Sequence, residues 1–287
     1  MKRYRTSFLL AALTASALAP LAPAFQQQEA AAQEAAVETL PSARALIDRF
    51  MEISAGRKMI EETSSVFFSG TVKMEAMGLN GTFANYRAKP NLTKQVTELG
   101  PTGEGLQGFD GKVAWMTHAM MGEQILEGAS RMTMVMQADY GASLMPESDY
   151  DLLEVKAREK FEGMDCYRLD FVYKAPQDEA EAKDTEAVRT GSLFFDAESG
   201  LIVGRKLTQA SPMGDTPVTA VLSDYTAYGE GGYLMPKNTR LKMGPTEVLI
   251  SIEKVEFDTV DPEEMKLPAS IRALVGDEKP KEMPKDV

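Results

Sequence analysis

The sequence predicts a mainly β protein (α+β) in which about ten strands form one large, curved antiparallel sheet, a half-barrel, with a few covering helices. Three observations lead to this fold class. Apolar and polar side chains alternate with a period of two through most of the chain after residue 64, which is typical of strands with one buried face. Short turn sequences separate these segments, so consecutive strands are expected to be antiparallel neighbours. Only two segments carry helical spacing.

The two ends of the chain are expected to lie outside this domain. Residues 1–24 have the features of a secretory signal peptide: Lys2, Arg3 and Arg5, then a short apolar run, then a small-residue cleavage pattern that ends at Ala24. We therefore expect cleavage after Ala24 and a periplasmic protein. Residues 25–39, rich in Ala, Gln and Glu, are expected to form a flexible leader, and residues 271–287 a charged flexible tail. A single domain should occupy residues 40–270.

The net charge limits the classes of binding partner, and the cysteine content excludes an internal disulfide. The formal net charge is −12, and removal of the signal peptide takes it to about −15, which disfavours nucleic acid and anionic membrane surfaces. We expect no nucleic-acid partner and no stable membrane span. The lone Cys166 cannot form an internal disulfide, and its apolar neighbours favour a buried, unreactive thiol.

The first predicted elements are a helix and a strand. The helix begins near Pro41, and Gly56 is expected to weaken or end it. Its apolar stripe comprises Leu46, Ile47, Phe50 and Ile53. The strand begins at Ser64 and places one set of apolar side chains on a single face: Val66, Phe68, Val72 and Met74.

Turn sequences divide the rest of the chain into strands. Asn80-Gly81 and Asp110-Gly111 are expected to be hairpin turns, because these dipeptides adopt positive φ readily. Further turns are expected at Glu162-Gly163 and at residues 198–200. The acidic residues 178–189 are expected to form a solvated loop.

One helical segment, residues 124–141, interrupts the strands. Ile125, Ala129, Met132 and Met136 follow helical spacing, which favours a helix lying against the sheet. The string "MTMVM" within it also fits a strand.

Motifs for catalysis and for tightly bound cofactors are missing. One histidine and one cysteine cannot form a tetrahedral zinc set, and the sequence contains no H-E-x-x-H, G-x-S-x-G or P-loop lysine. Gly103, Gly105 and Gly108 spell G-x-G-x-x-G but lead into a strand rather than a helix, so we expect a flexible loop there. We expect no catalytic residue, no metal and no cofactor, although the many carboxylates leave a hydrolase open.

Residues 108–128 contain the only tryptophan, the only histidine and three methionines. Three interpretations remain open. The cluster is ordinary core, or a Cu(I) site of thioethers around His118, or the wall of an adaptable apolar cavity. The methionines concerned are Met116, Met120, Met121, Met132, Met134 and Met136. Trp115 and Met116 cannot both face a cavity unless their strand is bulged.

An ordered set of motifs resembles the outer-membrane lipoprotein-sorting (LolA-like) superfamily. The strings are "GFDGKVAWMTHAMMG", "GMDCYRLDFVYK", "LFFDAESGLIVGRK", "VLSDYTAYGEGGYLMPKNTRL" and "ISIEKVEFD", and they span about residues 64–258. The resemblance implies a half-open antiparallel sheet with helices closing its mouth around a hydrophobic cavity. Carriers of this family hold the acyl chains of lipoproteins there. The family's usual proline is replaced around His118 and Ala119, and no lipobox cysteine follows the apolar run.

We therefore expect a non-enzymatic periplasmic protein that binds a lipid, an acyl chain or an acylated protein. An envelope protein partner is the first alternative, in which the chain is an interaction module without ligand; a Cu(I)-binding protein and a hydrolase are further alternatives. The residues expected to line the cavity are Val66, Phe68, Val72, Met74, Trp115, Met116, Met120, Met132 and Met136.

Overall fold

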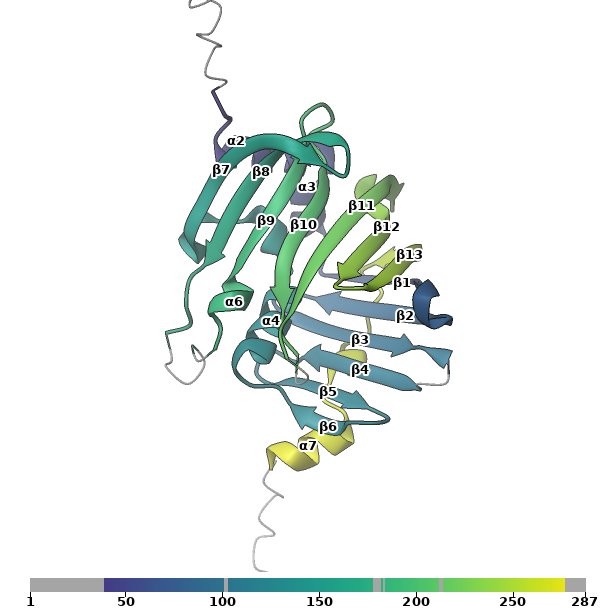
Figure 1. The fold of residues 1–287 in the computed structure, drawn as a ribbon. Helices are drawn as coiled ribbons and strands as arrows, with labels where there is room; N and C mark the ends of the chain where they lie inside the picture. The colour runs from purple at the N-terminus through teal and green to yellow at the C-terminus, as the bar shows by residue number, and fades with distance from the viewer. Residues whose placement is uncertain (1–38, 101–102, 178–181, 183, 212–213, 277–287) are drawn as a thin grey trace, which may run out of the picture. The chain divides into compact units, whose positions relative to one another are not determined.

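A computed structural model describes residues 39–100, 103–177, 182, 184–211 and 214–276 of the chain (Figure 1). The expected signal peptide and nearly all of the expected leader lie outside these residues. Thirteen strands form one sheet in the order β6-β5-β4-β3-β2-β1-β13-β12-β11-β10-β9-β8-β7, and each pair of neighbours is antiparallel. The predicted fold class is confirmed: a large, open antiparallel sheet with a few helices.

The sheet consists of two meanders. The first contains β1 (Ser65–Met74), β2 (Leu79–Ala88), β3 (Leu92–Glu98), β4 (Glu104–Phe109), β5 (Ala114–His118) and β6 (Gly122–Ile125). The second contains β7 (Tyr150–Phe161), β8 (Met164–Tyr173), β9 (Thr190–Asp196), β10 (Ile202–Gln209), β11 (Thr216–Tyr228), β12 (Tyr233–Met243) and β13 (Thr246–Phe257). Pairing of β1 with β13 joins the two meanders, which leaves β6 and β7 at opposite edges of the sheet.

This topology explains where the longest strand-to-strand connection runs. The chain must pass from β6 at one edge to β7 at the other, and it does so through α4 (Gly128–Ala138) and the short helices η3 (Ala142–Leu144) and η4 (Glu147–Asp149). Helix α4 contacts β3, β4 and β5 on one side and α6 (Glu186–Arg189) on the other. Figure 1 shows α4 between the first meander and strands β9 and β10.

The remaining helices cover particular strands. Helices α2 (Ala43–Ile53) and α3 (Gly56–Glu62) follow one another before β1, and α2 contacts β7 and η3. The short helix η1 (Glu75–Met77) joins β1 to β2. After β13, η5 (Pro262–Met265) contacts β3, and α7 (Ala269–Val275) contacts β6. None of the helices among the described residues is both long and apolar enough to cross a membrane.

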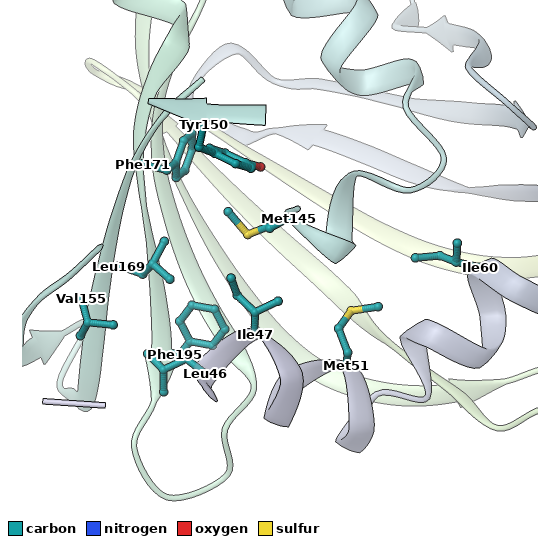
Figure 2. Packing of buried hydrophobic residues seen from close by; sticks show 10 residues of the cluster. All are labelled: Leu46, Ile47, Met51, Ile60, Met145, Tyr150, Val155, Leu169, Phe171 and Phe195. Atoms are coloured by element: carbon teal, nitrogen blue, oxygen red, sulfur yellow. The ribbon is translucent and has the colours of Figure 1, made fainter. Parts of the chain in front are cut away.

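The largest apolar cluster lies between α2 and the second meander (Figure 2). Ile47 and Met51 of α2 are almost fully buried there. In Figure 2 the rings of Tyr150 and Phe171 lie together, and Met145 lies between them and Ile47. The two rings meet edge to face, with their centroids 6.1 Å apart, a favourable aromatic geometry. The helix therefore holds the strands of this half in place.

The structure corrects several local expectations. Helix α2 does not end at Gly56; it ends before it, and Gly56 starts α3. The β1–β2 turn falls at residues 75–78, so Asn80-Gly81 lies inside β2. A Cβ on Gly81 would lie 1.8 Å from the Glu98 carbonyl oxygen. That glycine therefore permits a close strand approach rather than a turn.

The structure confirms three of the predicted turns and corrects the predictions for three other segments. The expected turns at Asp110-Gly111, Glu162-Gly163 and residues 198–200 are confirmed. The glycines of the G-x-G-x-x-G string do not form a flexible loop, because Gly105 and Gly108 belong to β4. The predicted start of the flexible tail, residue 271, lies too early in the sequence. Helix α7 continues to Val275, and Ile271 is 0% exposed. The expected solvated loop at 178–189 ends in α6, where Val188 is buried.

Candidate functional site: a cavity between the two meanders

A cavity of about 400 Å³ lies between the two halves of the sheet. Strands β3 and β8, which both line it, are eight steps apart in the strand order. In a flat sheet with strands about 4.8 Å apart, they would be separated by roughly 38 Å. The sheet must therefore curl strongly to bring both onto one cavity. The lining residues are Phe68, Asn85, Arg87, Thr93, Thr133, Met136, Gln137, Ala142, Ser143, Met145, Phe171, Tyr173, Val188, Leu193, Ile202, Arg205, Leu207 and Thr208.

The wall on the side of the first meander follows from its register. Phe68 of β1 pairs with Asn85 of β2, and the next row pairs Val66 with Arg87 and Arg87 with Thr93. Residues that are directly paired across antiparallel strands share a face. Phe68, Asn85, Arg87 and Thr93 therefore face the cavity together.

The opposite wall comes from β8, β9 and β10. Phe171, Leu193 and Leu207 provide its apolar surface. Tyr173 stacks on Tyr150 with a centroid distance of 4.6 Å, and burial raises the pKa of the Tyr173 hydroxyl, so this group stays neutral at physiological pH. Among the described residues, this wall is thus aromatic and aliphatic, and Arg205 is its one charged side chain.

The connection from β6 to β7 covers the cavity. Thr133, Met136 and Gln137 of α4 and Ala142, Ser143 and Met145 of the following segment contribute to the lining. Three contacts fix the residues that follow α4, to β2, to the β2–β3 turn and to the end of α3. Arg87 donates a hydrogen bond to the Asp139 carbonyl oxygen at 2.5 Å, the Tyr140 amide donates to the Pro90 carbonyl oxygen at 3.3 Å, and the Tyr140 and Thr63 hydroxyls lie 2.7 Å apart.

Of the nine residues predicted to line the cavity, the structure brings two to it: Phe68 and Met136. Val66, Val72 and Met74 share the face of β1 that carries Phe68, as their alternation predicts. Val72 and Met74 instead pack with Phe83, Val248 and Ile252 in a separate apolar cluster. They are core residues and do not line the cavity.

The register separates Trp115 from Met116. Met116 pairs with Gln107 of β4 and faces α4, where it lines a small pocket of about 90 Å³. Trp115 pairs with Gly108, and β5 carries no bulge, so the indole lies on the other face of the sheet. There it covers Gly108 and is 2% exposed. The assignment of Trp115 to the cavity is therefore wrong.

The other two predicted residues lie elsewhere. Met120 is 81% exposed at the β5–β6 turn, and Met132 is half-buried on α4 but absent from the cavity lining. The buried side chains of α4 are Thr133, Met134 and Ala138. The helix is confirmed, but its buried face is rotated from the one predicted, and Ile125 belongs to β6.

The methionines do not gather around His118. Met134 packs against Phe109 and Leu126, Met136 faces the cavity between the meanders, and Met120 faces solvent. The Nδ1 atom of His118 accepts a hydrogen bond from the Met120 amide at 3.2 Å. Among the described residues, no group of three or more His, Cys, Asp or Glu side chains is placed to hold a metal ion.

A larger hollow of about 710 Å³ lies beside α3 and the end of β13. Its lining is strongly charged and includes Lys58, Glu62, Glu230, Glu256 and Asp258. Clefts that hold apolar or drug-sized ligands are lined mainly by hydrophobic and aromatic side chains with few polar groups. The smaller cavity between the meanders fits that description better.

Sequence reasoning missed the polar residues of the cavity, above all Asn85, Arg87 and Arg205. One signal was present. Phe83, Asn85 and Arg87 alternate along β2, so a cation occupies the face that also carries a buried phenylalanine. A charged side chain on an apolar face is an unusual placement and often marks a site.

Comparison with known proteins supports the fold. No family model and no curated protein matches the chain. A DUF1329 family protein from Desulfovibrio piger has a similar structure, with a TM-score of 0.51 and 10% identity over 78% of this chain and 97% of that one. A LolA superfamily protein from Nitrosomonas europaea gives a TM-score of 0.51 and 9% identity over 79% and 99%. The chain has a LolA-like fold, which is the fold that the resemblance in the sequence implied.

Proposed function

We propose that this protein is a non-enzymatic periplasmic binding protein that holds the acyl chain of a lipid or lipidated protein in the cavity between the two meanders. The observation that carries the proposal is the cavity itself. Its volume of about 400 Å³ falls within the usual range for ligand pockets. Its apolar lining comes from both halves of the sheet and from α4, and the predicted signal peptide supports export.

The physical basis of binding is burial of methylene groups. Each methylene removed from water contributes about 0.8 kcal/mol, so about ten of them supply roughly 8 kcal/mol. Part of this favourable free energy is offset, because the ligand loses translational and rotational freedom when it binds. An acyl chain along Phe68, Phe171 and Leu193 would also gain dispersion contacts with aromatic and branched side chains.

Helix α4 offers a matched pair of variants for the test. Met136 lines the cavity, whereas Met132, one turn earlier on the same helix, does not. Met136→Glu places a carboxylate where an acyl chain would lie, and the cost of burying that charge should reduce palmitate affinity by at least about tenfold. Met132→Glu makes the same chemical change and should leave affinity within about twofold of wild type.

Palmitate affinity would be measured by titration calorimetry and by native mass spectrometry. Circular dichroism would establish that both variants are folded. Equal palmitate affinities for wild type and Met136→Glu would contradict the cavity assignment. A wild-type chain that binds no acyl ligand would favour the interaction-module alternative.

A further inference from the structure

The cavity contains polar atoms that the fold leaves unsatisfied. Nε of Arg87 and Oδ1 of Asn85 are shielded from solvent, and neither has a hydrogen-bond partner among the described residues. Both side chains line the cavity. Buried polar groups in folded proteins are nearly always paired, because an unpaired one loses its hydration without compensation. Two such atoms in one cavity wall are positions where a bound ligand or an ordered water would complete the pairing.

Arg87 is only partly used by the fold. One of its terminal nitrogens donates to the Asp139 carbonyl oxygen, and its guanidinium carbon lies 5.9 Å from the centroid of the Tyr140 ring. Neither contact involves Nε, and no carboxylate forms an ion pair with Arg87 within the described part of the chain. A guanidinium offers its donors as a planar fork that suits carboxylate and phosphate oxygens.

Arg205 of β10 places a second cation at the same cavity from the opposite wall. No hydrogen bond or ion pair joins its guanidinium to another described residue, and its side chain is exposed. Burial lowers the pKa of Arg87, and the positive charge of Arg205 lowers it further, whereas Tyr140 and Asp139 act in the opposite direction. Both arginines line the same cavity from opposite walls, so an anion bound between them would interact favourably with two positive charges.

The described residues that line the cavity carry a charge opposite to the net charge of the protein. The full chain has 43 acidic and 31 basic residues. Among the described residues that line the cavity are two arginines and no aspartate, glutamate or lysine. Asp139, whose charge acts on Arg87, lies outside the lining, and its carboxylate accepts a hydrogen bond from the Gly141 amide at 2.8 Å. A basic site inside an acidic protein is a selective environment for anions.

We propose that the cavity selects an amphiphile with an anionic head group, a carboxylate or a phosphate, bound between Arg87 and Arg205 with its apolar chain along Phe68, Phe171 and Leu193. This inference rests on the proposed acyl-chain function and narrows its ligand class. A neutral lipid would leave both guanidinium groups without a counter-ion and Nε of Arg87 without an acceptor.

The test compares probes with one chain and different heads: palmitate, hexadecyl phosphate and hexadecanol, together with inorganic phosphate alone. Wild-type protein should bind the two anionic amphiphiles at least about tenfold more tightly than hexadecanol, which corresponds to about 1.4 kcal/mol. Inorganic phosphate should bind far more weakly than hexadecyl phosphate, because it buries no methylene group.

Neighbouring residues of β10 provide the control. Arg205→Gln removes the cavity cation that has no hydrogen-bond or ion-pair partner among the described residues, and it should reduce the preference for anionic heads by at least about fivefold. Lys206→Gln removes the same charge from the adjacent residue, whose ammonium lies 5.2 Å from the centroid of the Phe194 ring and outside the cavity lining. It should leave the preference unchanged. Arg87→Lys keeps the charge without Nε and should give an intermediate preference.

The outcomes separate the two proposals. Equal binding of palmitate and hexadecanol, unaffected by Arg205→Gln, would overturn the head-group inference and leave acyl-chain binding intact. Binding of inorganic phosphate as tight as that of hexadecyl phosphate would also overturn it, since the site would then recognise an anion without a chain. Failure of all three amphiphiles to bind would contradict the proposed function itself.

Discussion

Replacement of Ile47 by alanine tests whether α2 is a fixed cover of the second meander. Ile47 is 1% exposed and packs in the cluster with Leu169, Phe171 and Phe195 (Figure 2). The substitution removes three carbon atoms, a transfer cost of about 2.4 kcal/mol at about 0.8 kcal/mol each. Incomplete relaxation around the vacated volume raises the expected loss of unfolding free energy to about 3–4 kcal/mol.

Ile53, on the same helix, serves as the matched control. It is 37% exposed, so Ile53→Ala should cost only about 1–1.5 kcal/mol, because less area is removed from water and solvent can fill the gap. Urea denaturation followed by circular dichroism would measure both. With a slope near 3 kcal/mol/M, the midpoint should fall by about 1 M for Ile47→Ala and by less than about 0.5 M for Ile53→Ala. Equal midpoint shifts would refute the packing assigned to α2.

Three further predictions concern residues outside the cavity. Trp115→Ala should cost about 3–5 kcal/mol of stability yet leave palmitate affinity unchanged, since Trp115 faces away from the cavity; loss of affinity at unchanged stability would contradict this. Hydrogen bonds from the backbone and side chain of Ser64 lower the pKa of Asp258. Its stabilising contribution is therefore present above the unfolded-state pKa and is lost as the pH falls through the folded-state value. Asp258→Asn should thus be less stable than wild type at neutral pH and converge with it in strong acid; a constant difference across pH would argue against that assignment. Burial raises the pKa of the Cys166 thiol to about 11, so a thiol reagent such as Ellman's should react slowly with folded protein and rapidly in urea.

The strands and several turns could be predicted from sequence because their signals are local. Alternation in β1 correctly placed Val66, Phe68, Val72 and Met74 on one face. Alternation could not say which part of that face lies over the cavity, because this depends on the curl of the sheet and on the pairing of β1 with β13. That pairing joins residues nearly 200 positions apart, such as Val66 and Phe257. A local sequence pattern therefore cannot predict it.

The cavity residues were harder to predict for the same reason. Arg87 reaches its position through its register with Val66 and Thr93, and Arg205 comes from the other meander. In the methionine-rich stretch, strand parity predicted that Trp115 and Met116 face opposite sides unless their strand is bulged, but it could not say which of them faces the cavity. The two residues do face opposite sides, and neither lines the cavity. On α4, one helical turn separates Met136, which lines the cavity, from Met132, which does not.

Photo-crosslinking would test the central claim most directly. A palmitate analogue that carries a diazirine at the end of its chain would be bound to the full chain, irradiated and mapped by peptide mass spectrometry. Acyl-chain burial between the meanders predicts labels on peptides containing Phe68, Met136, Phe171 or Leu193, and loss of those labels with excess palmitate. Labels confined to exposed apolar side chains such as Met120 and Leu274, at any ligand concentration, would contradict it.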